Sequence, residues 1–361
     1  MNPSSPMILI GIGGAGAAIA RGVNRAFGDG LRYLLADTDA ATGEAGGPFV
    51  LLGGDRLCGR GSGGDLVAAR TAAEESIGLL DDELNGVRLA VIVTALGGGT
   101  GGGATIEAVR HLSDQGIPTV IFATTPFAFE AVDRQQSARG VMALIEDRAN
   151  ATFFLPLDKL VEGEDNMTEA LKRAVGTLAS AVTLFWRLVE KPGYIRLDAE
   201  RLRRLVSGAG RGRFATVTVN GPARAREASD QLLRSPLLTT GSGPVRAMLC
   251  GVLAGDDLRL SELSTLSETL RSGFGPTAAF ELATVNDEET FAGRLSVVIL
   301  LFESGGGEES APVAGGRRRS RSVLGNGQSG RGRFTNSERS EHNGVDLDSP
   351  TYLRLGISLD F

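Results

Sequence analysis

The sequence predicts an α/β protein whose N-terminal part is a doubly wound parallel sheet. Short apolar runs alternate with helix-like segments from residue 7 to about residue 157, the pattern of strands joined by helical crossovers. Glycine-rich turns follow several of these runs, and ligands bind beyond the carboxyl ends of strands in such sheets. After a long helical pattern at 167–190, β-like runs and helices resume. They indicate a second, smaller α/β domain.

The expected elements follow one another in a regular order. We interpret a helical pattern where apolar residues recur every three to four positions, and a strand in a short apolar run. Lys191-Pro192-Gly193 should end the long helix, because proline and glycine break helices. Strands are expected at 7–10, 31–36, 49–52, 89–96, 118–125, 151–157, 213–219, 245–253 and 294–302. Helices are expected at 17–27, 66–80, 106–116, between 125 and 151, at 167–190 and within 196–210.

Composition excludes several classes of function. The net charge of −6 gives no general reason to expect a nucleic-acid partner. His111 and His342 are the only histidines, which argues against a histidine-based triad or zinc site, and no metal site is expected. Cys58 and Cys250 lack metal-ligand spacing and should be buried free thiols of a reducing compartment. We find no leader-like start and no membrane-length apolar segment, so we expect a cytoplasmic location.

Three glycine loops follow strands. GIGGAG (11–16) fits G-x-G-x-x-G and alone suggests a dinucleotide site, with Asp37 and Asp39 where a Rossmann domain carries its acidic residue. However, GRGSGGD (59–65) and GGGTGGG (97–103) follow later strands, and a Rossmann domain needs only one such loop. Successive backbone N–H groups can wrap several phosphates, so a triphosphate site is the sharper interpretation. The alternative is a set of tight turns that allow close helix–sheet packing.

These motifs, taken in order, resemble one family. GIGGAG, DTDA, RGSGGDLVAARTAAEES, GGGTGGGAT and TTPFAFEAVDR look like the FtsZ family of the tubulin superfamily, over roughly residues 7–304. DSPTYLR (348–354) resembles the peptide by which that family docks onto membrane-anchored adaptors. The resemblance implies the tubulin/FtsZ-type fold, GTP or GDP between subunits with Mg²⁺ as a candidate ion, and head-to-tail protofilaments in cell division.

The resemblance also implies a domain organisation. The last two segments differ in composition, because the linker is rich in Gly, Ser and Arg and should be disordered, whereas the tail regains apolar and aromatic residues. The expected parts are a nucleotide-binding domain at 1–166, a central helix at 167–194, a C-terminal α/β domain at 195–304, a linker at 305–345 and a docking peptide at 346–361.

Site residues carry over from the family by motif. Glu130 would accept hydrogen bonds from the ribose, and Arg134 would add positive charge near sugar and phosphate. The alternative for this pair is an ordinary i, i+4 ion pair. The expected nucleotide-binding residues are Gly13, Gly14, Gly16, Asp39, Gly61, Gly63, Gly64, Gly97, Gly98, Gly99, Thr100, Gly101, Glu130 and Arg134. Those of the docking tail are Asp348, Pro350, Tyr352, Leu353 and Arg354.

The base-binding segment departs from the family pattern. Leu171 stands near the position of a Phe that stacks on guanine, and Val175-Gly176 where a polar residue reads the base. Leu157 replaces the Asn of a Pro-Asn-Asp turn. A site that loses its polar partners should lose much of its base selectivity.

The catalytic loop also departs from the family pattern. In the family a loop of the type Asn-x-Asp-x-x-Asp enters the next subunit's site and polarises the attacking water. Here Asp198 is kept, while Arg196 and Arg201 replace the Asn and the second Asp. A guanidinium cannot act as a base, and the substitute Glu200 is turned by about 100° for one residue's shift on a helix. We expect weak or absent hydrolysis, unless the arginines contact the neighbour's γ-phosphate instead.

Three functions stay open at this stage. The first is an FtsZ-like cytoskeletal GTPase with weak hydrolysis. The second is a nucleotide-independent scaffold, or a partner that co-assembles with a conventional FtsZ. The third and most remote is an NAD-dependent oxidoreductase, for which the chain offers no hydride-transfer site. The Arg-rich stretch RRRSRS (317–322) is either a solvated spacer or weakly attracted to anionic lipid or nucleic acid.

Overall fold

The computed structural model describes residues 5–28, 30–161, 166–207, 210–239 and 243–303, together with 341–342 and 345–346. Met1–Gly307 is one compact unit and Glu308–Phe361 a second. In the second unit, β11 (Glu341–His342) and β12 (Val345–Asp346) pair antiparallel. The predicted adaptor-docking residues 348–354 lie outside the described residues, and the domain boundaries stay a prediction.

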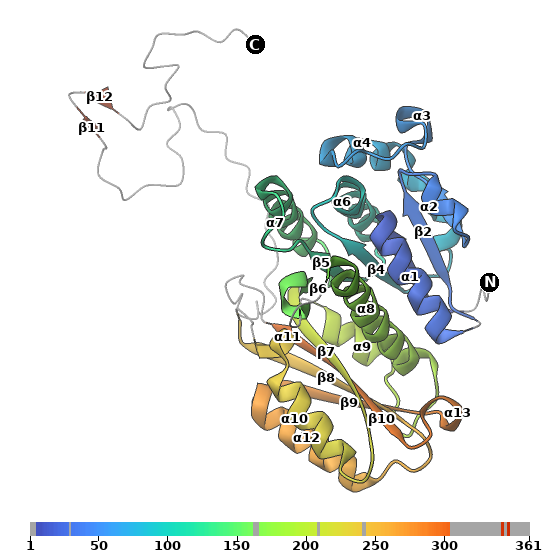
Figure 1. The fold of residues 1–361 in the computed structure, drawn as a ribbon, viewed down its shortest axis with the longest axis vertical. Helices are drawn as coiled ribbons and strands as arrows, with labels where there is room; N and C mark the ends of the chain where they lie inside the picture. Colours follow the sequence, from blue (N-terminus) through green and yellow to red (C-terminus); the bar gives the residue numbers. More distant parts are fainter. Residues whose placement is uncertain are drawn as a thin grey trace, which may run out of the picture. The chain divides into compact units, whose positions relative to one another are not determined.

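One ten-stranded sheet runs through the first unit, in the order β3-β2-β1-β4-β5-β6-β7-β10-β8-β9 (Figure 1). The pairs from β3 to β7 are parallel, and β10 pairs antiparallel with both β7 and β8. The predicted α/β class and doubly wound parallel sheet are therefore confirmed. The strands are β1 (Met7–Ile12), β2 (Tyr33–Asp37), β3 (Phe49–Leu51), β4 (Leu89–Ala95), β5 (Thr119–Thr125), β6 (Ala151–Pro156), β7 (Gly210–Asn220), β8 (Val245–Ala254), β9 (Ala279–Asn286) and β10 (Arg294–Glu303).

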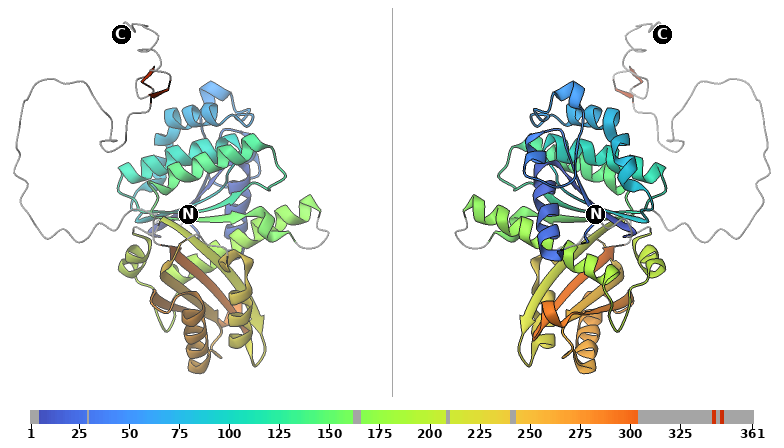
Figure 2. Two further views of the ribbon diagram at one scale, coloured as in Figure 1. Left: turned by 90° about the vertical axis from the view of Figure 1, so that its left-hand side faces the viewer. Right: turned by 90° about the vertical axis from the view of Figure 1, so that its right-hand side faces the viewer.

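Helices cover both faces of the sheet. The side views of Figure 2 show α8 between the N-terminal layers and the strands β7–β10 with their helices. The longer helices are α1 (Gly13–Phe27), α4 (Leu66–Ser76), α6 (Gly99–Asp114), α7 (Val132–Glu146), α8 (Met167–Glu190), α9 (Ala199–Val206), α10 (Arg224–Arg234) and α12 (Leu260–Phe274). The short ones are α2 (Ala41–Glu44), α3 (Gly54–Leu57), α5 (Asp81–Leu84), α11 (Pro236–Thr239), α13 (Glu288–Phe291) and two 3₁₀ turns, η1 (Ile77–Leu80) and η2 (Leu157–Leu160).

The alternation of apolar residues along each strand divides the core into layers. Met7 and Leu9 face a cluster formed with α1 and α8, while Ile8 and Ile10 face one formed with α6 and α7. A third cluster lies between α10, α12 and strands β7, β8 and β10. Because the first cluster continues from β1 to β10, α8 packs against both halves of the sheet.

The long helix α8 begins and ends where its sequence predicts. Asn166 and Glu169 form a capping box at its start, which satisfies backbone N–H groups of the first turn. Its apolar face includes Trp186, the chain's single tryptophan, whose side chain is fully buried. Trp186 fluorescence therefore reports on the core.

Several expected elements need correction. Helices α1 and α6 begin at Gly13 and Gly99, inside the glycine motifs rather than after them, because residues without side chains form first turns packed directly on the strands. Strand β9 was missed, since its sequence AFELATVN carries Glu281 and Asn286 among its apolar residues. Of the two cysteines, Cys250 is buried but Cys58 is exposed. Burial raises the pKa of the Cys250 thiol to about 12.

Gly16 is a position where we expect stability to depend on the missing side chain. A Cβ there would overlap the carbonyl oxygen of Val93, whereas at Gly14 the nearest atom is Asp37 Oδ2, 3.9 Å away. Gly16→Ala should lower the free energy of unfolding by about 1–3 kcal/mol, as overpacking does. Gly14→Ala, the matched control two residues earlier, should change it by no more than about 1 kcal/mol. Urea unfolding followed by Trp186 fluorescence measures both, and equal effects would refute close packing at Gly16.

Candidate functional site

The three glycine loops meet at the carboxyl edge of the sheet. Thr100, at the start of α6, lies with its Oγ1 2.6 Å from Oγ1 of Thr38 after β2. Its hydroxyl is also 3.4 Å from Oγ of Ser62, in the loop before α4. A Cβ on Gly13 would stand 3.2 Å from the backbone nitrogen of Gly101. The loops after β1, β2, β3 and β4 therefore form one continuous group.

Threonine hydroxyl groups hydrogen-bond to the backbone of the glycine loops. Thr94 Oγ1, at the end of β4, donates to the carbonyl oxygens of Ile12 (3.2 Å) and Gly101 (3.0 Å). Thr105 Oγ1 also donates to Gly101 O, at 2.6 Å. The turns that start α1 and α6 are thus held to the same strand end.

The glycines of these loops serve two different purposes. At Gly16, Gly99 and Gly101 a Cβ would overlap neighbouring atoms. These positions therefore allow close packing, as expected if the loops were tight turns between helix and sheet. At Gly63, Gly64 and Gly98 no atom lies within 4 Å of the Cβ position. Gly14 is similarly open. Packing does not explain the open positions. At Gly63 and Gly64 a positive φ favours glycine, whereas neither packing nor φ requires glycine at Gly14 and Gly98.

The two helices that start in these loops have bare N-termini. Neither α1 nor α6 has a side-chain cap, and neither carries an acidic residue in its first turn. By contrast, Asp65 caps α4 by accepting hydrogen bonds from the N–H groups of Val67 and Ala68. An uncapped N-terminus leaves N–H donors at the positive end of the helix dipole, which favours an anion.

Helix α4 is fixed against α6 by a buried carboxylate. Glu107, 1% exposed on α6, accepts hydrogen bonds from Arg70 of α4 and Arg110 of α6, each at 2.7 Å. Burial acts to raise the pKa of Glu107, but the hydrogen bonds from both arginines outweigh it, so its pKa lies below its usual range. This ion-pair network holds the loop 59–65 in place against α6.

The acidic residues after β2 are engaged locally. Asp37 accepts hydrogen bonds from the Thr38 N–H and the Thr42 hydroxyl, both at 2.7 Å. Asp39 accepts one from the Ala41 N–H at 2.9 Å, and its side chain lies beside Gly61. Both carboxylates stabilise the turn that places Thr38, a residue the sequence interpretation overlooked although DTDA contains it.

Glu130 and Arg134 form the ion pair of the simpler interpretation. Arg134 Nη1 lies 2.9 Å from Glu130 Oε2, and Arg134 Nε donates to the Gly97 carbonyl oxygen at 3.3 Å. The other Glu130 oxygen accepts the Phe127 N–H at 2.9 Å. Arg134 thus brings a guanidinium to the GGGTGGG loop, while Glu130 already has partners for both oxygens.

The side of α8 that would face a base presents apolar atoms. Leu171 is 45% exposed, and Val175 packs partly against the core. Gly176 has no atom within 4 Å of its Cβ position. Leu157 is buried, and its neighbour Asp158 accepts the Ala128 N–H at 3.1 Å. These positions can cover the flat face of a base but offer no group that reads its edge.

The loop expected to act on a neighbour's nucleotide lies against β9. Ile195 and Tyr194 bond to Thr284 and Asn286. Asp198 caps α9 by accepting the Arg201 N–H at 2.7 Å, and the Arg201 guanidinium lies 3.5 Å from its other oxygen and 3.7 Å from Glu281. None of these contacts reaches the glycine loops.

Glu200 and Arg196 complete that loop. Glu200 pairs with Arg203 at 3.0 Å, and this hydrogen bond lowers the pKa of Glu200. Arg196 is exposed. Of the expected acidic groups, therefore, each has an arginine beside it.

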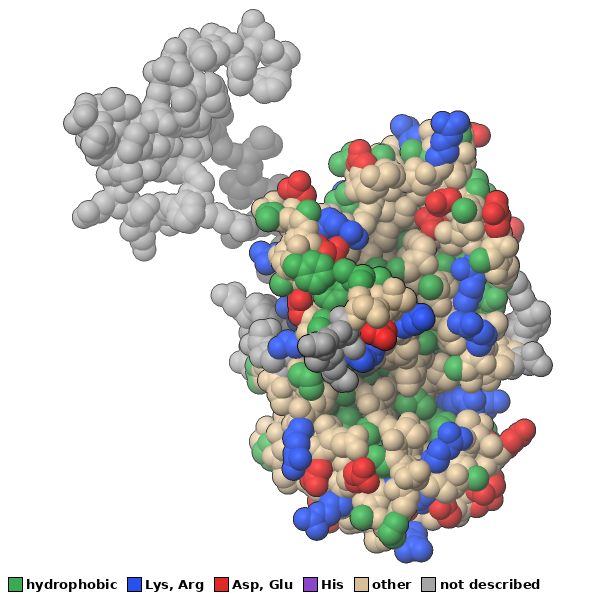
Figure 3. Space-filling model, viewed as in Figure 1, with side chains coloured by type: hydrophobic (Ala, Val, Ile, Leu, Met, Phe, Trp, Pro, Cys, Tyr) green, Lys and Arg blue, Asp and Glu red, His purple; other side chains and the backbone are tan. Residues whose placement is uncertain are grey.

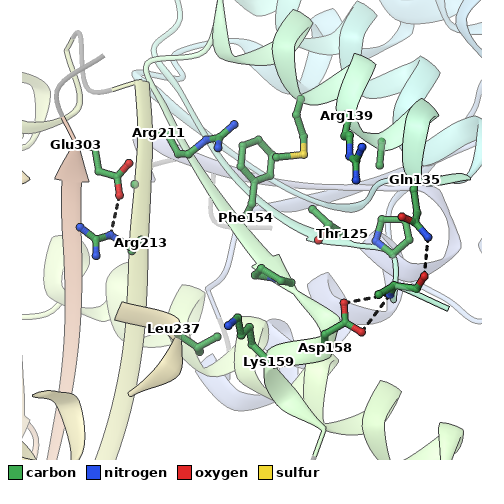
Figure 4. A pocket seen from close by; sticks show the side chains of 16 residues that line it. Thr125, Gln135, Arg139, Phe154, Asp158, Lys159, Arg211, Arg213, Leu237 and Glu303 are labelled. Carbon is green, nitrogen blue, oxygen red and sulfur yellow. Dashed lines mark hydrogen bonds and ion pairs between the residues drawn. The ribbon is translucent and has the colours of Figure 1, made fainter. Parts of the chain in front are cut away.

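A cavity of about 640 Å³ is lined by residues of β5, α7, β6 and β7, and by no residue of the three glycine loops (Figure 4). It opens between β6 and β7, and Figure 4 places Arg139 and Arg211 on the same side as Phe154. Arg213 pairs there with Glu303 at 2.7 Å. The face drawn in Figure 3 intersperses acidic and basic side chains without an extended patch of one sign. No described helix is long and apolar enough to cross a membrane.

Open glycines beside bare helix N-termini, at the carboxyl edge of a doubly wound sheet, give this protein the chemistry of a polyphosphate-binding α/β class. Residues 6–164 match the model of the Tubulin/FtsZ family, GTPase domain. The chain is 31% identical over 294 residues to the cell division protein FtsZ of Pseudomonas putida, covering 80% of this chain and 74% of that protein. FtsZ of Coxiella burnetii is 31% identical over 290 residues, covering 78% and 74%.

Solved structures agree with that relationship. An empty FtsZ dimer from M. jannaschii superposes with a TM-score of 0.77 at 24% identity, covering 82% of this chain and 87% of that one. CetZ2 from Haloferax volcanii, solved as a GTPγS-bound protofilament, gives 0.71 at 20% identity, covering 84% and 94%. The chain belongs to the Tubulin/FtsZ family as an FtsZ-like protein.

Proposed function

We propose that this protein binds GTP or GDP at the glycine loops and assembles head-to-tail into filaments in cell division or a related process. The single observation that supports it most is the pair of acid-free, uncapped helix N-termini beside Gly14 and Gly98, where side chains are absent without a packing reason. Phosphate oxygens would accept hydrogen bonds from the backbone N–H groups of these first turns. Gly61, Gly63 and Gly64, all at positive φ, would close over the terminal phosphate.

The nucleotide would be held through its phosphates more than through its base. Leu171 and Val175 supply apolar contact, and Gly176 supplies none, so guanine has no edge-reading partner on α8. We propose a preference for GTP weaker than a site with a polar partner would give. Mg²⁺ would accompany the triphosphate, bound by phosphate oxygens and water.

Hydrolysis should be weak in the assembled protein. A loop that polarises water for a neighbouring subunit needs free carboxylates, but Arg201 lies within ion-pair distance of Asp198, and Arg203 holds Glu200. A carboxylate neutralised by a guanidinium is a poorer acceptor for a water proton. We therefore propose long-lived filaments, which a conventional FtsZ could join.

The partners and location follow from the same proposal. The protein would polymerise with itself in the cytoplasm and be recruited to the membrane at the division site by an adaptor. The adaptor would bind the tail through Asp348, Pro350, Tyr352, Leu353 and Arg354, as the resemblance of DSPTYLR implies.

A binding titration tests the first step of this proposal. We expect nucleotide-stripped protein to bind GTP with micromolar affinity and to discriminate against ATP by less than about 100-fold. The reason is that α8 lacks a polar contact to the edge of the base, and such a contact is worth about 1–3 kcal/mol. Calorimetry with GTP, ATP and tripolyphosphate separates the contributions of base and phosphates. Absence of binding to all three would refute a phosphate site at these loops.

A second candidate function is a scaffold that assembles without nucleotide. The apolar character of Leu171, Val175 and Gly176 favours it, since the positions that would read a base carry no polar group. Electron microscopy of nucleotide-stripped protein distinguishes the two functions. Filaments without nucleotide would favour the scaffold, and strictly nucleotide-dependent filaments would exclude it.

A further inference from the structure

Strand β7 is longer than the neighbour that pairs with it on one side. It runs from Gly210 to Asn220, and its pairing with β6 covers only Gly210, Arg211 and Gly212. On the other side β10 pairs with β7 along almost its whole length. Residues 214–220 therefore form a free sheet edge in the middle of the ten-stranded sheet.

No described segment bonds to the backbone on this open side. Just before the edge, the Arg213 guanidinium donates to the Leu238 carbonyl oxygen. The other long edge differs, because in β9 the N–H groups of Thr284 and Asn286 donate to the carbonyl oxygens of Ile195 and Pro192. The edge strand β3 has only three residues.

The sequence of the free edge lacks the usual protection. Exposed edges are normally blunted by charges, proline or bulges that prevent pairing with another chain. Residues 214–220 read FATVTVN, with no charge and no proline, and their pairing with β10 has no register shift. Such an edge is a template for an added strand.

Two cavities flank the edge. One, of about 640 Å³, lies where β6 and β7 separate. The other, of about 600 Å³, lies between Ala215–Val217 and the side of α10. Because side chains of a strand alternate between faces, an added strand would place every second side chain toward α10. The α10 side of the second cavity carries charged side chains such as Arg226, Glu227 and Asp230, and Ala215 and Val217 form its β7 side. An added strand would place its apolar side chains over Ala215 and Val217.

One segment of the sequence has the matching pattern. From Leu353 to Phe361 the chain reads LRLGISLDF, with apolar residues at 353, 355, 357, 359 and 361 and other residues between them. Strict alternation over nine residues is typical of a strand with one buried face. The adaptor-docking motif at 348–354 overlaps only its first two residues and does not explain the alternation.

We propose that residues 353–361 of one copy of this chain add as a strand to the free edge of β7 in another copy. Roughly fifty residues separate β10 from this segment, and as few as twelve extended residues span about 40 Å. That distance is comparable to the diameter of a folded unit of this size, so the segment reaches a neighbouring copy. The inference goes beyond nucleotide binding and does not depend on it.

Hydrogen exchange on the full chain, without nucleotide, tests the proposal. In the intact protein the outward amides of residues 214–220 should exchange at least ten-fold more slowly than in the variant Leu355→Asp with Ile357→Asp. This protection should weaken on dilution, because it is supplied by another copy. A synthetic peptide of residues 352–361 should restore it to the double variant, and a permuted peptide of the same composition should not.

Edge variants provide the matched comparison. Thr216→Lys, which places a charge in the middle of the free edge, should abolish protection by the peptide, whereas Asn220→Lys at the exposed end should not. Equal exchange with and without the tail substitutions would overturn the proposal. Protection that is independent of concentration would also overturn it, because the segment would then act within its own chain.

Discussion

Replacing Gly98 by Asp should abolish nucleotide binding without weakening the fold. Gly98 is the N-cap of α6, with φ −95° and ψ 166°, a conformation open to any residue. No atom lies within 4 Å of its Cβ position. An Asp there could accept hydrogen bonds from the first-turn N–H groups and raise stability by up to about 1 kcal/mol. The same carboxylate would occupy the donors that a phosphate needs and repel it.

The expected loss of affinity is large. Two unit charges 4 Å apart interact by about 4 kcal/mol at the effective dielectric constant of a protein surface, which is roughly 1,000-fold in a binding constant. Gly98→Asn is the matched control, because it caps the helix without charge and should cost far less affinity. Calorimetry with GTP and thermal unfolding measure the two properties. If Gly98→Asp bound GTP normally, the N-terminus of α6 would not be part of the phosphate site.

The sequence predicted the fold where local patterns decide it. The apolar runs at 7–10 and 89–96 correspond to strands β1 and β4, which are buried except at Ala95, and buried parallel strands carry such runs without alternation. Helix α8 has a 24-residue amphipathic pattern with caps at both ends. Strand β9 was missed because Glu281 lies at a half-buried position, paired with Arg201 of α9. Only tertiary context shows that contact.

The site was predictable in location but not in detail. Glycine content alone does not distinguish Gly16, which packs against β4, from Gly98, which faces open space. That difference depends on which strand lies beside each turn. The contributions of Thr38 and Ser62 depend on hydroxyls from separate loops meeting at Thr100. The free edge of β7 depends on the separation of β6 from β7 after Phe153 and Gly212, which no local pattern records.

Restoring the acidic loop should raise GTP hydrolysis in the assembled protein. In the double variant Arg196→Asn with Arg201→Asp, the guanidinium 3.5 Å from Asp198 is replaced by a carboxylate. The cap of α9 is kept, because Asp198 accepts the backbone N–H of residue 201. Two free carboxylates could then polarise a water in the neighbouring site. Positioned groups of this kind contribute about 100-fold or more, so we expect phosphate release to rise at least ten-fold.

A charge-matched variant separates chemistry from assembly. Arg196→Asn with Arg204→Asp makes the same change in net charge on the same loop and helix, but it keeps Arg201 beside Asp198 and Arg203 on Glu200, so it should leave the hydrolysis rate per assembled subunit low. Sedimentation gives the amount of polymer, and phosphate release per polymerised subunit gives the rate. If the variant Arg196→Asn with Arg201→Asp assembled with GTP and released phosphate no faster, Arg196 and Arg201 would not be what limits hydrolysis. The limit would then lie in how the nucleotide is held, at the apolar side of α8 around Leu171 and Val175.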